Sequence, residues 1–450
     1  MKIVFVSLGC DKNLVDTEMM MGQLADAGHE ITNDESEADI AVVNTCSFIS
    51  DAKEESIDTL ISMGRLKEEG SLKGIIAAGC LAQRYSEDIR RDIPEVDEIV
   101  GTMAIDDIAA AVERLAEGKK ETFIKPIDGP VICGKPRLVS TGGHFAYLKI
   151  AEGCDKRCSY CAIPFFRGKY RSVPKEVLVK EAKKLAFDGV KELILVAQET
   201  TIYGMDLYKK KMLPELLREL SNIEGIEFIR LLYCYPEAID DELIAEMKVN
   251  KKVCHYLDMP IQHASDRVLK CMGRLTNRAK LTELIGKLRR EIPDICLRTT
   301  LITGFPGETG RDFKQMKEFV KDMRFDRLGV FTYSREEGTR AAEMSGQIPE
   351  FIKKMRRNSI MKLQQQIAFE KAEGEIGRSF KVMVEGRIPD ESDSYKAVYA
   401  CRTYKDAPEV DGFLFLETER ELMTGDVVPV KVTASNKYDL IGVPDYEFTE

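Results

Sequence analysis

The pattern of apolar and polar positions divides the first 125 residues into short strands that alternate with amphipathic helices. Short apolar runs bounded by glycine or polar residues are typical of parallel strands that are buried on both faces. Strands that alternate with helices predict a parallel, doubly wound sheet. The strands are expected at KIVFVSL, DIAVVNTC, GIIAAGC and DEIVGT, and the helices at DTEMMMGQLADAG, AKEESIDTLISMGRLKEE and around EDIRRDI.

The alternation stops at residues 126–139, where three prolines and two glycines predict a linker. It resumes between residues 140 and 345, where six strands with intervening helices predict a partial (β/α)6 barrel. The chemistry of such barrels lies at the carboxyl ends of the strands. The strands are expected at HFAYLKIAEGC, KELILVAQET, GIEFIRLLYCYP, HYLDMPIQH, ICLRTTLITGFPGE and RLGVFTYS. Residues 347–376 are predicted to be helical.

From Gly377 onward the pattern changes to short alternating runs, SFKVMVEG, YKAVYACRTY, GFLFLET and VVPVKVT. Such runs with turns between them predict a small antiparallel β-barrel. The expected fold class is therefore α/β with an added β-barrel. Three domains are predicted, an N-terminal α/β domain over residues 1–125, a central barrel with its following helices over 140–376, and a small β-barrel over 377–450.

Composition narrows the class of protein further. Of the 450 residues, 44% are hydrophobic, which supplies enough apolar surface for several cores. A net charge of −10 argues against a general nucleic-acid binder, which is normally basic. The start MKIVFVSLGC predicts a strand instead of a signal peptide, and no window approaches the ~18 apolar residues of a membrane span. We therefore expect a soluble, cytoplasmic protein with no membrane partner.

Three of the twelve cysteines are grouped in the run GCDKRCSYC, as Cys154, Cys158 and Cys161, with Tyr160 before the last of them. Three thiolates at this spacing can hold three irons of a 4Fe–4S cube and leave the fourth iron open to a substrate. The alternative is a zinc site or structural thiols. Zinc sites usually pair two CxxC knuckles or add histidines, and none of the four histidines lies at a ligand-like spacing from this run.

Three more cysteines, Cys10, Cys46 and Cys80, each lie at the carboxyl end of a predicted N-terminal strand. Ligands of open α/β sheets bind at that edge, so these side chains are expected to converge although they are distant in the sequence. The pattern predicts a second three-cysteine cluster site. The alternative is three buried cysteines that cap strands independently. The remaining cysteines are predicted to be structural, namely Cys133, Cys234, Cys254, Cys271, Cys296 and Cys401.

The CxxxCxΦC run resembles that of the radical S-adenosylmethionine (SAM) enzymes. The whole chain, with its strand-end cysteines, barrel and C-terminal β-domain, resembles the radical SAM methylthiotransferases, in which the last domain is called TRAM. SLGCDKNLVDTE, VNTCSFISDAKEESIDTL and APEVDGFLF are similar to the branch that modifies an aspartate of the twelfth small-subunit ribosomal protein. Asp11 and Thr17 stand where that branch usually has proline and serine.

This resemblance implies that the protein adds a methylthio group to the β-carbon of that aspartate. Because the C–H bond there is unactivated, a carbon radical is required. The implied cofactors are a radical SAM 4Fe–4S cluster on Cys154, Cys158 and Cys161, an auxiliary 4Fe–4S cluster on Cys10, Cys46 and Cys80, and SAM as substrate and radical source. The implied partners are the ribosomal protein, a low-potential electron donor and a sulfur source. No catalytic residue is assigned beyond the cluster ligands.

Five residues are predicted to contact or adjoin SAM. Gln198 and Glu199 end the second barrel strand, Gln262 ends the fourth, Arg298 lies on the fifth, and Tyr160 precedes the last cysteine of the run. The alternative for each is a polar cap at a strand end. The nearby basic residues Arg167, Lys169 and Arg171 are expected either to approach the substrate or to be solvated.

Two other functions remain open from sequence. The first is methylthiolation of a tRNA adenosine of the isopentenyladenosine type, and the second is a two-cluster electron carrier. From Gly377 to Glu450 there are nine Lys and Arg and fifteen Asp and Glu, a net charge of −6. An acidic domain suits a basic ribosomal protein better than tRNA, so a nucleic acid is not favoured as the direct substrate. The electron carrier is also not favoured, because electron transfer needs no open iron.

Overall fold

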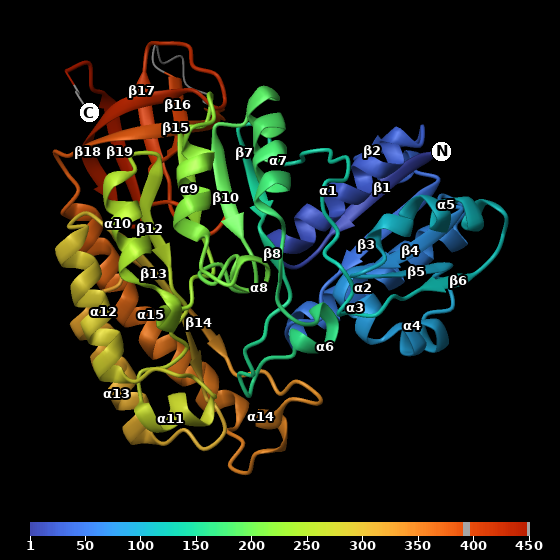
Figure 1. The fold of residues 1–450 in the computed structure, drawn as a ribbon, viewed down its shortest axis with the longest axis horizontal. Coiled ribbons are helices and arrows are strands. Elements are labelled where there is room, and N and C mark those ends of the chain that lie inside the picture. The colour runs from blue at the N-terminus through green and yellow to red at the C-terminus, as the bar shows by residue number, and fades with distance from the viewer. Residues whose placement is uncertain (390–396, 448–450) are drawn as a thin grey trace.

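The computed structural model describes residues 1–389 and 397–447, and it has three lobes (Figure 1). The N-terminal domain is a parallel six-stranded sheet in the order β2-β1-β3-β4-β5-β6. Its strands are β1 (Lys2–Ser7), β2 (Glu30–Thr32), β3 (Ile40–Thr45), β4 (Gly74–Ala78), β5 (Glu98–Gly101) and β6 (Glu121–Phe123). Its helices are α1 (Asp11–Asp26), α2 (Ser50–Glu68), α3 (Gly79–Arg84), α4 (Ser86–Asp92) and α5 (Ile108–Ala116), with short 3-10 turns at Glu35–Glu37 and Ile105–Asp107.

The predicted doubly wound sheet is confirmed, with two differences. The edge strands β2 and β6 were not predicted, because each has only three residues and is partly exposed, which leaves no apolar run. The first helix begins at Asp11, earlier than the expected start at Asp16, because Cys10 has the extended backbone of an N-cap residue. The helix therefore follows the strand with a very short connection.

The central domain contains the six expected strands as one parallel sheet in the order β14-β13-β12-β11-β10-β7. They are β7 (Phe145–Lys149), β10 (Glu192–Val196), β11 (Phe228–Leu231), β12 (Val253–Asp258), β13 (Cys296–Thr303) and β14 (Arg327–Thr332). The longer helices are α7 (Lys175–Phe187), α9 (Leu213–Ser221), α10 (Asp241–Val249), α12 (Arg278–Glu291), α13 (Gly310–Met323) and α15 (Glu350–Glu373). The short elements are β8 (Ala151–Glu152), β9 (Arg171–Ser172), α6 (Pro164–Arg167), α8 (Met205–Tyr208), α11 (Asp266–Cys271), α14 (Arg340–Glu343) and the 3-10 turn Pro236–Ala238.

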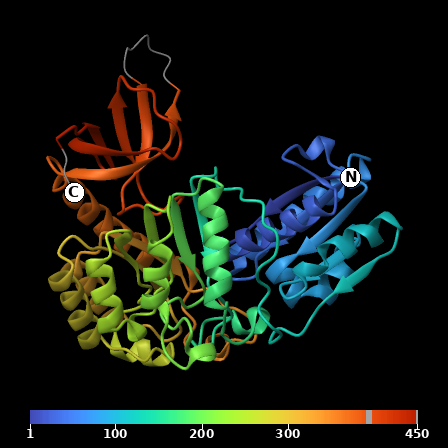
Figure 2. The same ribbon diagram turned by 45° about the horizontal axis from the view of Figure 1, so that its top comes forward.

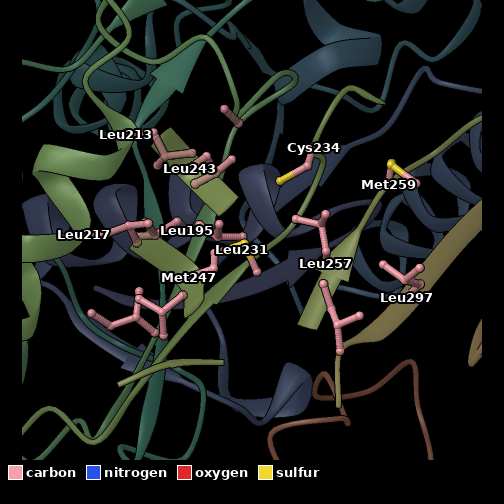
Figure 3. Packing of buried hydrophobic residues seen from close by; sticks show 14 of the residues in the cluster. Leu195, Leu213, Leu217, Leu231, Cys234, Leu243, Met247, Leu257, Met259 and Leu297 are labelled. Carbon is pink, nitrogen blue, oxygen red and sulfur yellow. The ribbon is translucent and has the colours of Figure 1, made fainter. Parts of the chain in front are cut away.

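The helix-facing side of the central sheet is packed with leucine (Figure 3). Leu195, Leu231, Leu257 and Leu297 pair in register across β10, β11, β12 and β13, so they form one row on the same face. All four side chains are fully buried. Among the described residues, no helix is long and apolar enough to cross a membrane.

The C-terminal domain is a closed five-stranded barrel in the order β15-β16-β17-β19-β18. The strands are β15 (Ser379–Ile388), β16 (Ala397–Arg402), β17 (Leu414–Thr418), β18 (Val427–Asn436) and β19 (Asp439–Pro444). The predicted strand 395–404 begins with two residues that lie outside the described ranges. Two features differ from the expectation: β19 was not predicted, and its pairing with β17 is parallel, so the barrel is not wholly antiparallel. The boundaries of the three domains stay predictions.

One buried apolar cluster contains residues of all three lobes. Figure 2 shows the β-barrel above the central domain and the N-terminal domain beside it. Polar contacts add to this cluster at the start of β10. Glu192 accepts from Arg230 Nε on β11 and contacts Arg402 Nη1 on β16, each at 2.7 Å. Arg402 Nε also donates to Glu385 Oε1 at 2.7 Å, and Arg230 donates to the carbonyl of Tyr404 at 2.6 Å. The C-terminal barrel is therefore joined to the central sheet through buried charges.

We expect Arg402→Met to lower the free energy of unfolding by about 3–5 kcal/mol, because it removes a cation shared by Glu192 and Glu385 and leaves a negative charge of this buried group uncompensated. Chemical denaturation followed by circular dichroism measures this loss. The matched control is Lys248→Met, which removes an exposed pair with Glu291 and is expected to cost about 0–1 kcal/mol. Equal losses in the two variants would contradict a special role for the buried group.

Candidate functional site

The three cysteines of the N-terminal domain lie at the carboxyl edge of its sheet. Cys10 follows β1 and caps α1, Cys46 directly follows β3, and Cys80 lies in the first turn of α3 after β4. Because β1, β3 and β4 are neighbours, their carboxyl ends bring the thiols to one edge. Gly9 has a φ of +92°, and a Cβ placed on it would lie 2.8 Å from the Cβ of Cys46. Only glycine allows this close approach.

These three thiols share one electrostatic environment. Burial raises the pKa of Cys46, and the neighbouring Cys10 raises it further. Burial raises the pKa of Cys80 to about 12, with Cys46 and Cys10 adding to the rise. The positive charge of Arg167 lowers both pKa values. Since thiolates are the form that binds iron, a cation at this edge favours the ligand form of the thiols.

Cys154, Cys158 and Cys161 lie in the loop between β8 and α6, after the first central strand. The loop is held by its own backbone, because the N–H of Cys154 donates to the carbonyl of Gly168 at 3.0 Å and that of Cys161 to Cys158 at 3.1 Å. Burial, together with the neighbouring thiol of Cys158, raises the pKa of Cys154 and of Cys161 to about 12. The Sγ of Cys158 lies 3.3 Å from the hydroxyl of Tyr235.

The two sets of cysteines are brought together by α6. This short helix follows Cys161 directly and packs against α3, which carries Cys80. Cys80 shares a small buried cluster with Ala162 and Phe166. Thr102, at the end of β5, donates to the carbonyl of Phe166 at 2.7 Å. The cysteine loop of the central domain therefore abuts the strand-end edge of the N-terminal sheet.

Each set offers the donors that a cluster with one open iron requires, namely three thiols at one sheet edge. Within residues 1–389 and 397–447, no three His, Cys, Asp or Glu side chains are grouped to hold a single metal ion. A 4Fe–4S cube takes each thiolate on a separate iron, so its ligands are spread around it. The residues fit such a group, and the role of the six cysteines as its ligands stays a prediction.

Polar side chains at the ends of β10 and β12 have buried atoms without a hydrogen bond. Gln198 Nε2 donates to Glu152 Oε1 at 2.8 Å, but Gln198 Oε1 has no partner among the described residues. Glu199 Oε2 and Gln262 Oε1 also lack a hydrogen bond among the described residues, although Lys156 Nζ lies 3.8 Å from Glu199 Oε2. Unpaired buried polar atoms cost free energy, so this arrangement fits a site that a polar ligand such as SAM completes. Burial also raises the pKa of the Glu199 carboxyl.

Arg298 and Tyr160 differ from these three residues. Arg298 Nη1 donates to Asp258 Oδ1 at 2.9 Å, and its Nε lies 3.9 Å from Asp411 of the C-terminal barrel. Its guanidinium is therefore already paired, and a contact with the SAM carboxylate stays a prediction. Tyr160 packs beside Phe305 in a small apolar cluster, and burial raises the pKa of its phenol.

Four charged residues between the two sets of cysteines were not predicted as a group. Arg167 Nη1 contacts Asp16 Oδ2 at 2.7 Å and Glu152 Oε2 at 3.0 Å. Lys149 also contacts both carboxylates. All four side chains are buried. The sequence signal was available, because Lys149 lies in a strand of otherwise apolar residues and Asp16 on the buried face of a helix.

The basic run after the cysteine loop is corrected by the structure. Arg167 is only 2% exposed, so it is not solvated, and its approach to the substrate stays a prediction. Arg171 is half-buried and donates to backbone carbonyls of the linker, including that of Gly129 at 3.0 Å. Lys169 alone is exposed, as one alternative expected. The reason is that α6 folds back onto the N-terminal domain, which no local pattern reveals.

Comparison with known proteins identifies the parts of the chain. Residues 2–101 match the uncharacterized protein family UPF0004, residues 148–320 the Radical SAM superfamily, and residues 376–444 the TRAM domain. A ribosomal protein uS12 methylthiotransferase RimO from Lachnoclostridium phytofermentans is 58% identical over 99% of this chain and 100% of its own length. A protein of the same name from Clostridioides difficile is 47% identical, over 99% of both chains.

Among solved structures, the fold is similar to that of TsrM, a radical S-adenosylmethionine methyltransferase from Kitasatospora setae. The TM-score is 0.53 at 15% identity, over 87% of this chain and 79% of that chain. This likeness concerns the fold alone. The full-length relatives carry the assignment, and the chain belongs to the RimO family of radical SAM methylthiotransferases.

Proposed function

We propose that this protein transfers a methylthio group to the β-carbon of an aspartate in ribosomal protein uS12. The observation that carries the proposal is the meeting of two sets of three cysteines, each at the carboxyl edge of its own sheet, around α6. Two adjacent clusters, each with one open iron, match a reaction that must both activate a carbon and deliver sulfur to it. Relatives that are 58% and 50% identical are named ribosomal protein uS12 methylthiotransferases.

In this proposal Cys154, Cys158 and Cys161 hold the radical SAM cluster, and Cys10, Cys46 and Cys80 hold the auxiliary cluster. When bound, the clusters supply the electron that cleaves SAM and an open iron for the sulfur that is transferred. Gln198, Glu199 and Gln262 would orient SAM, because each has one buried oxygen without a hydrogen bond among the described residues. Tyr160 would form an apolar wall beside the bound SAM. A low-potential electron donor and a sulfur source complete the reaction.

The protein substrate is supported by charge. The residues from Gly377 to the end carry a net charge of −6, which attracts a basic ribosomal protein and repels the phosphates of tRNA. A loop of the C-terminal domain also reaches the face of the central sheet opposite the leucine row, where Tyr256 donates to Asp411 at 2.7 Å. In this proposal the acidic domain would attract the basic substrate to the enzyme. The enzyme would act in the cytoplasm, where its substrate is made.

Alanine substitutions in the two sets of cysteines are expected to remove different activities. Cys158→Ala should abolish cleavage of SAM to 5′-deoxyadenosine, because the radical SAM cluster loses a ligand. Cys46→Ala should still form deoxyadenosine while losing methylthio transfer, because only the auxiliary site is altered. Chromatography of the nucleoside and mass spectrometry of uS12 measure the two outputs. The control Cys271→Ala, at an exposed thiol, should retain both. Full methylthiolation by Cys46→Ala would refute the second cluster.

The choice of substrate is tested directly with anaerobically reconstituted enzyme, SAM and a reductant. We expect mass spectrometry to show that one hydrogen of the uS12 aspartate is replaced by a methylthio group, with no change in unmodified tRNA. Modification of tRNA alone would refute the substrate and leave the chemistry intact. Formation of deoxyadenosine without either modified product would refute methylthio transfer and support only the cleavage of SAM.

A further inference from the structure

Arg167 connects the cysteine loop of the central domain to the cysteines of the N-terminal domain. It lies six positions after Cys161 and ends α6, yet its side chain points into the N-terminal domain. Its Nε lies 3.3 Å from the Sγ of Cys80, and its Nη2 donates to Asn13 Oδ1 at 2.5 Å. The side chain is 2% exposed, so these contacts are shielded from water. A residue of the central domain thus contacts a predicted ligand of the auxiliary cluster.

The geometry gives Cys80 an N–H donor. Asn13 also lies 3.5 Å from the Cys80 sulfur, but through Oδ1, which accepts. Its Nδ2 donates instead to the carbonyls of Leu8 and Thr45. When Cys80 is a thiolate it has no proton to offer that oxygen. Among the described residues, two side chains lie within hydrogen-bond distance of this sulfur, and only Arg167 then donates to it.

The surrounding charges show what Arg167 contributes. The cations Lys149 and Arg167 face the carboxylates Asp16 and Glu152, so the buried group has no net charge. Arg167 therefore acts on the sulfur through its own charge and through the directed Nε–H bond, and a lysine at this position would keep only the charge. Glu152 continues the contacts to Gln198, one of the predicted SAM contacts. The hydrogen-bonded chain runs from Cys80 to the SAM end of the site.

We propose that Arg167 is a positioning residue for the auxiliary cluster, which donates its Nε–H to the Cys80 thiolate and thereby sets the reduction potential of that cluster. The inference rests on the proposed function, because it takes Cys80 as a cluster ligand. Hydrogen bonds to ligand sulfurs stabilise the reduced, more negative form of an iron–sulfur cluster. Removal of the bond therefore lowers the potential. A residue of the central domain in this way sets the reduction potential of the cluster that the N-terminal domain binds.

If Arg167 only held the two domains together, its substitution would affect the cluster no more than the loss of another buried arginine at the same boundary. The chain contains such an arginine as a control. Arg137 is also a buried arginine at the boundary of the two domains, 2.5 Å from Glu18 of α1 and 2.9 Å from Glu181 of α7. No contact joins it to a cysteine among the described residues. Arg137→Lys should therefore disturb the domain boundary in the same way as Arg167→Lys without touching the cluster.

The first experiment measures the reduction potential by electron paramagnetic resonance (EPR) during a redox titration. It uses protein in which Cys154, Cys158 and Cys161 are replaced by alanine, so that the auxiliary cluster alone gives a signal. Arg167→Lys, which keeps the charge, should lower the midpoint by about 59 mV or more, a tenfold change in a one-electron equilibrium. Arg167→Gln should lower it further, while Arg137→Lys should leave it unchanged. An unchanged midpoint in Arg167→Lys, or an equal shift in Arg137→Lys, overturns the proposal.

A second measurement needs no substitution at Arg167. The same protein is labelled with 15N-arginine, and hyperfine spectroscopy of the reduced cluster should show a coupled arginine nitrogen. A bound cluster without that coupling overturns the inference and leaves the proposed function standing. Absence of any cluster after reconstitution, measured as iron and sulfide content, overturns the auxiliary cluster itself and the inference with it. The two failures are therefore distinguishable.

Discussion

Four buried charges between the N-terminal and central domains determine how the two halves of the site face each other. Removing Lys149, Arg167, Asp16 and Glu152 from water is costly, and the cost is offset only when every partner is in place. A displaced interface would leave a charge buried and unpaired, so the group tolerates one arrangement of the domains. Because α6 carries Arg167 and directly follows Cys161, that arrangement also brings the two sets of cysteines together.

The C-terminal barrel is held by the same kind of interaction at the starts of the central strands. Glu192 lies between Arg230 and Arg402, so a residue at the start of a central strand is neutralised by both domains. Farther along the sheet, Asp411 approaches Arg298, which also contacts Asp258. The acidic domain thereby contacts the central sheet near the starts of its strands, including Arg327 at the start of β14.

Much of the fold follows from local patterns, because buried strands and amphipathic helices have distinct periods. The short strands β2, β6 and β19 escaped prediction, since a few half-exposed residues carry no period that separates them from loops. The parallel pairing of β17 with β19 was also not predictable, because the order of strands in a barrel depends on closure. The cysteines were found from their spacing and their place at strand ends, and their function as ligands is still a prediction.

The sequence by itself determined most of the strands and helices, where the six cysteines lie on them, and the family to which the chain belongs. Those properties depend on local sequence patterns or on short sequence motifs. Only the tertiary structure decided that Arg167 reaches Cys80 across 87 positions and Asp16 across 151. A basic residue after a cysteine loop has the same local pattern whether it is solvated or buried. Its partner depends on how two separately patterned domains pack, and that is settled by the pairing of buried charges.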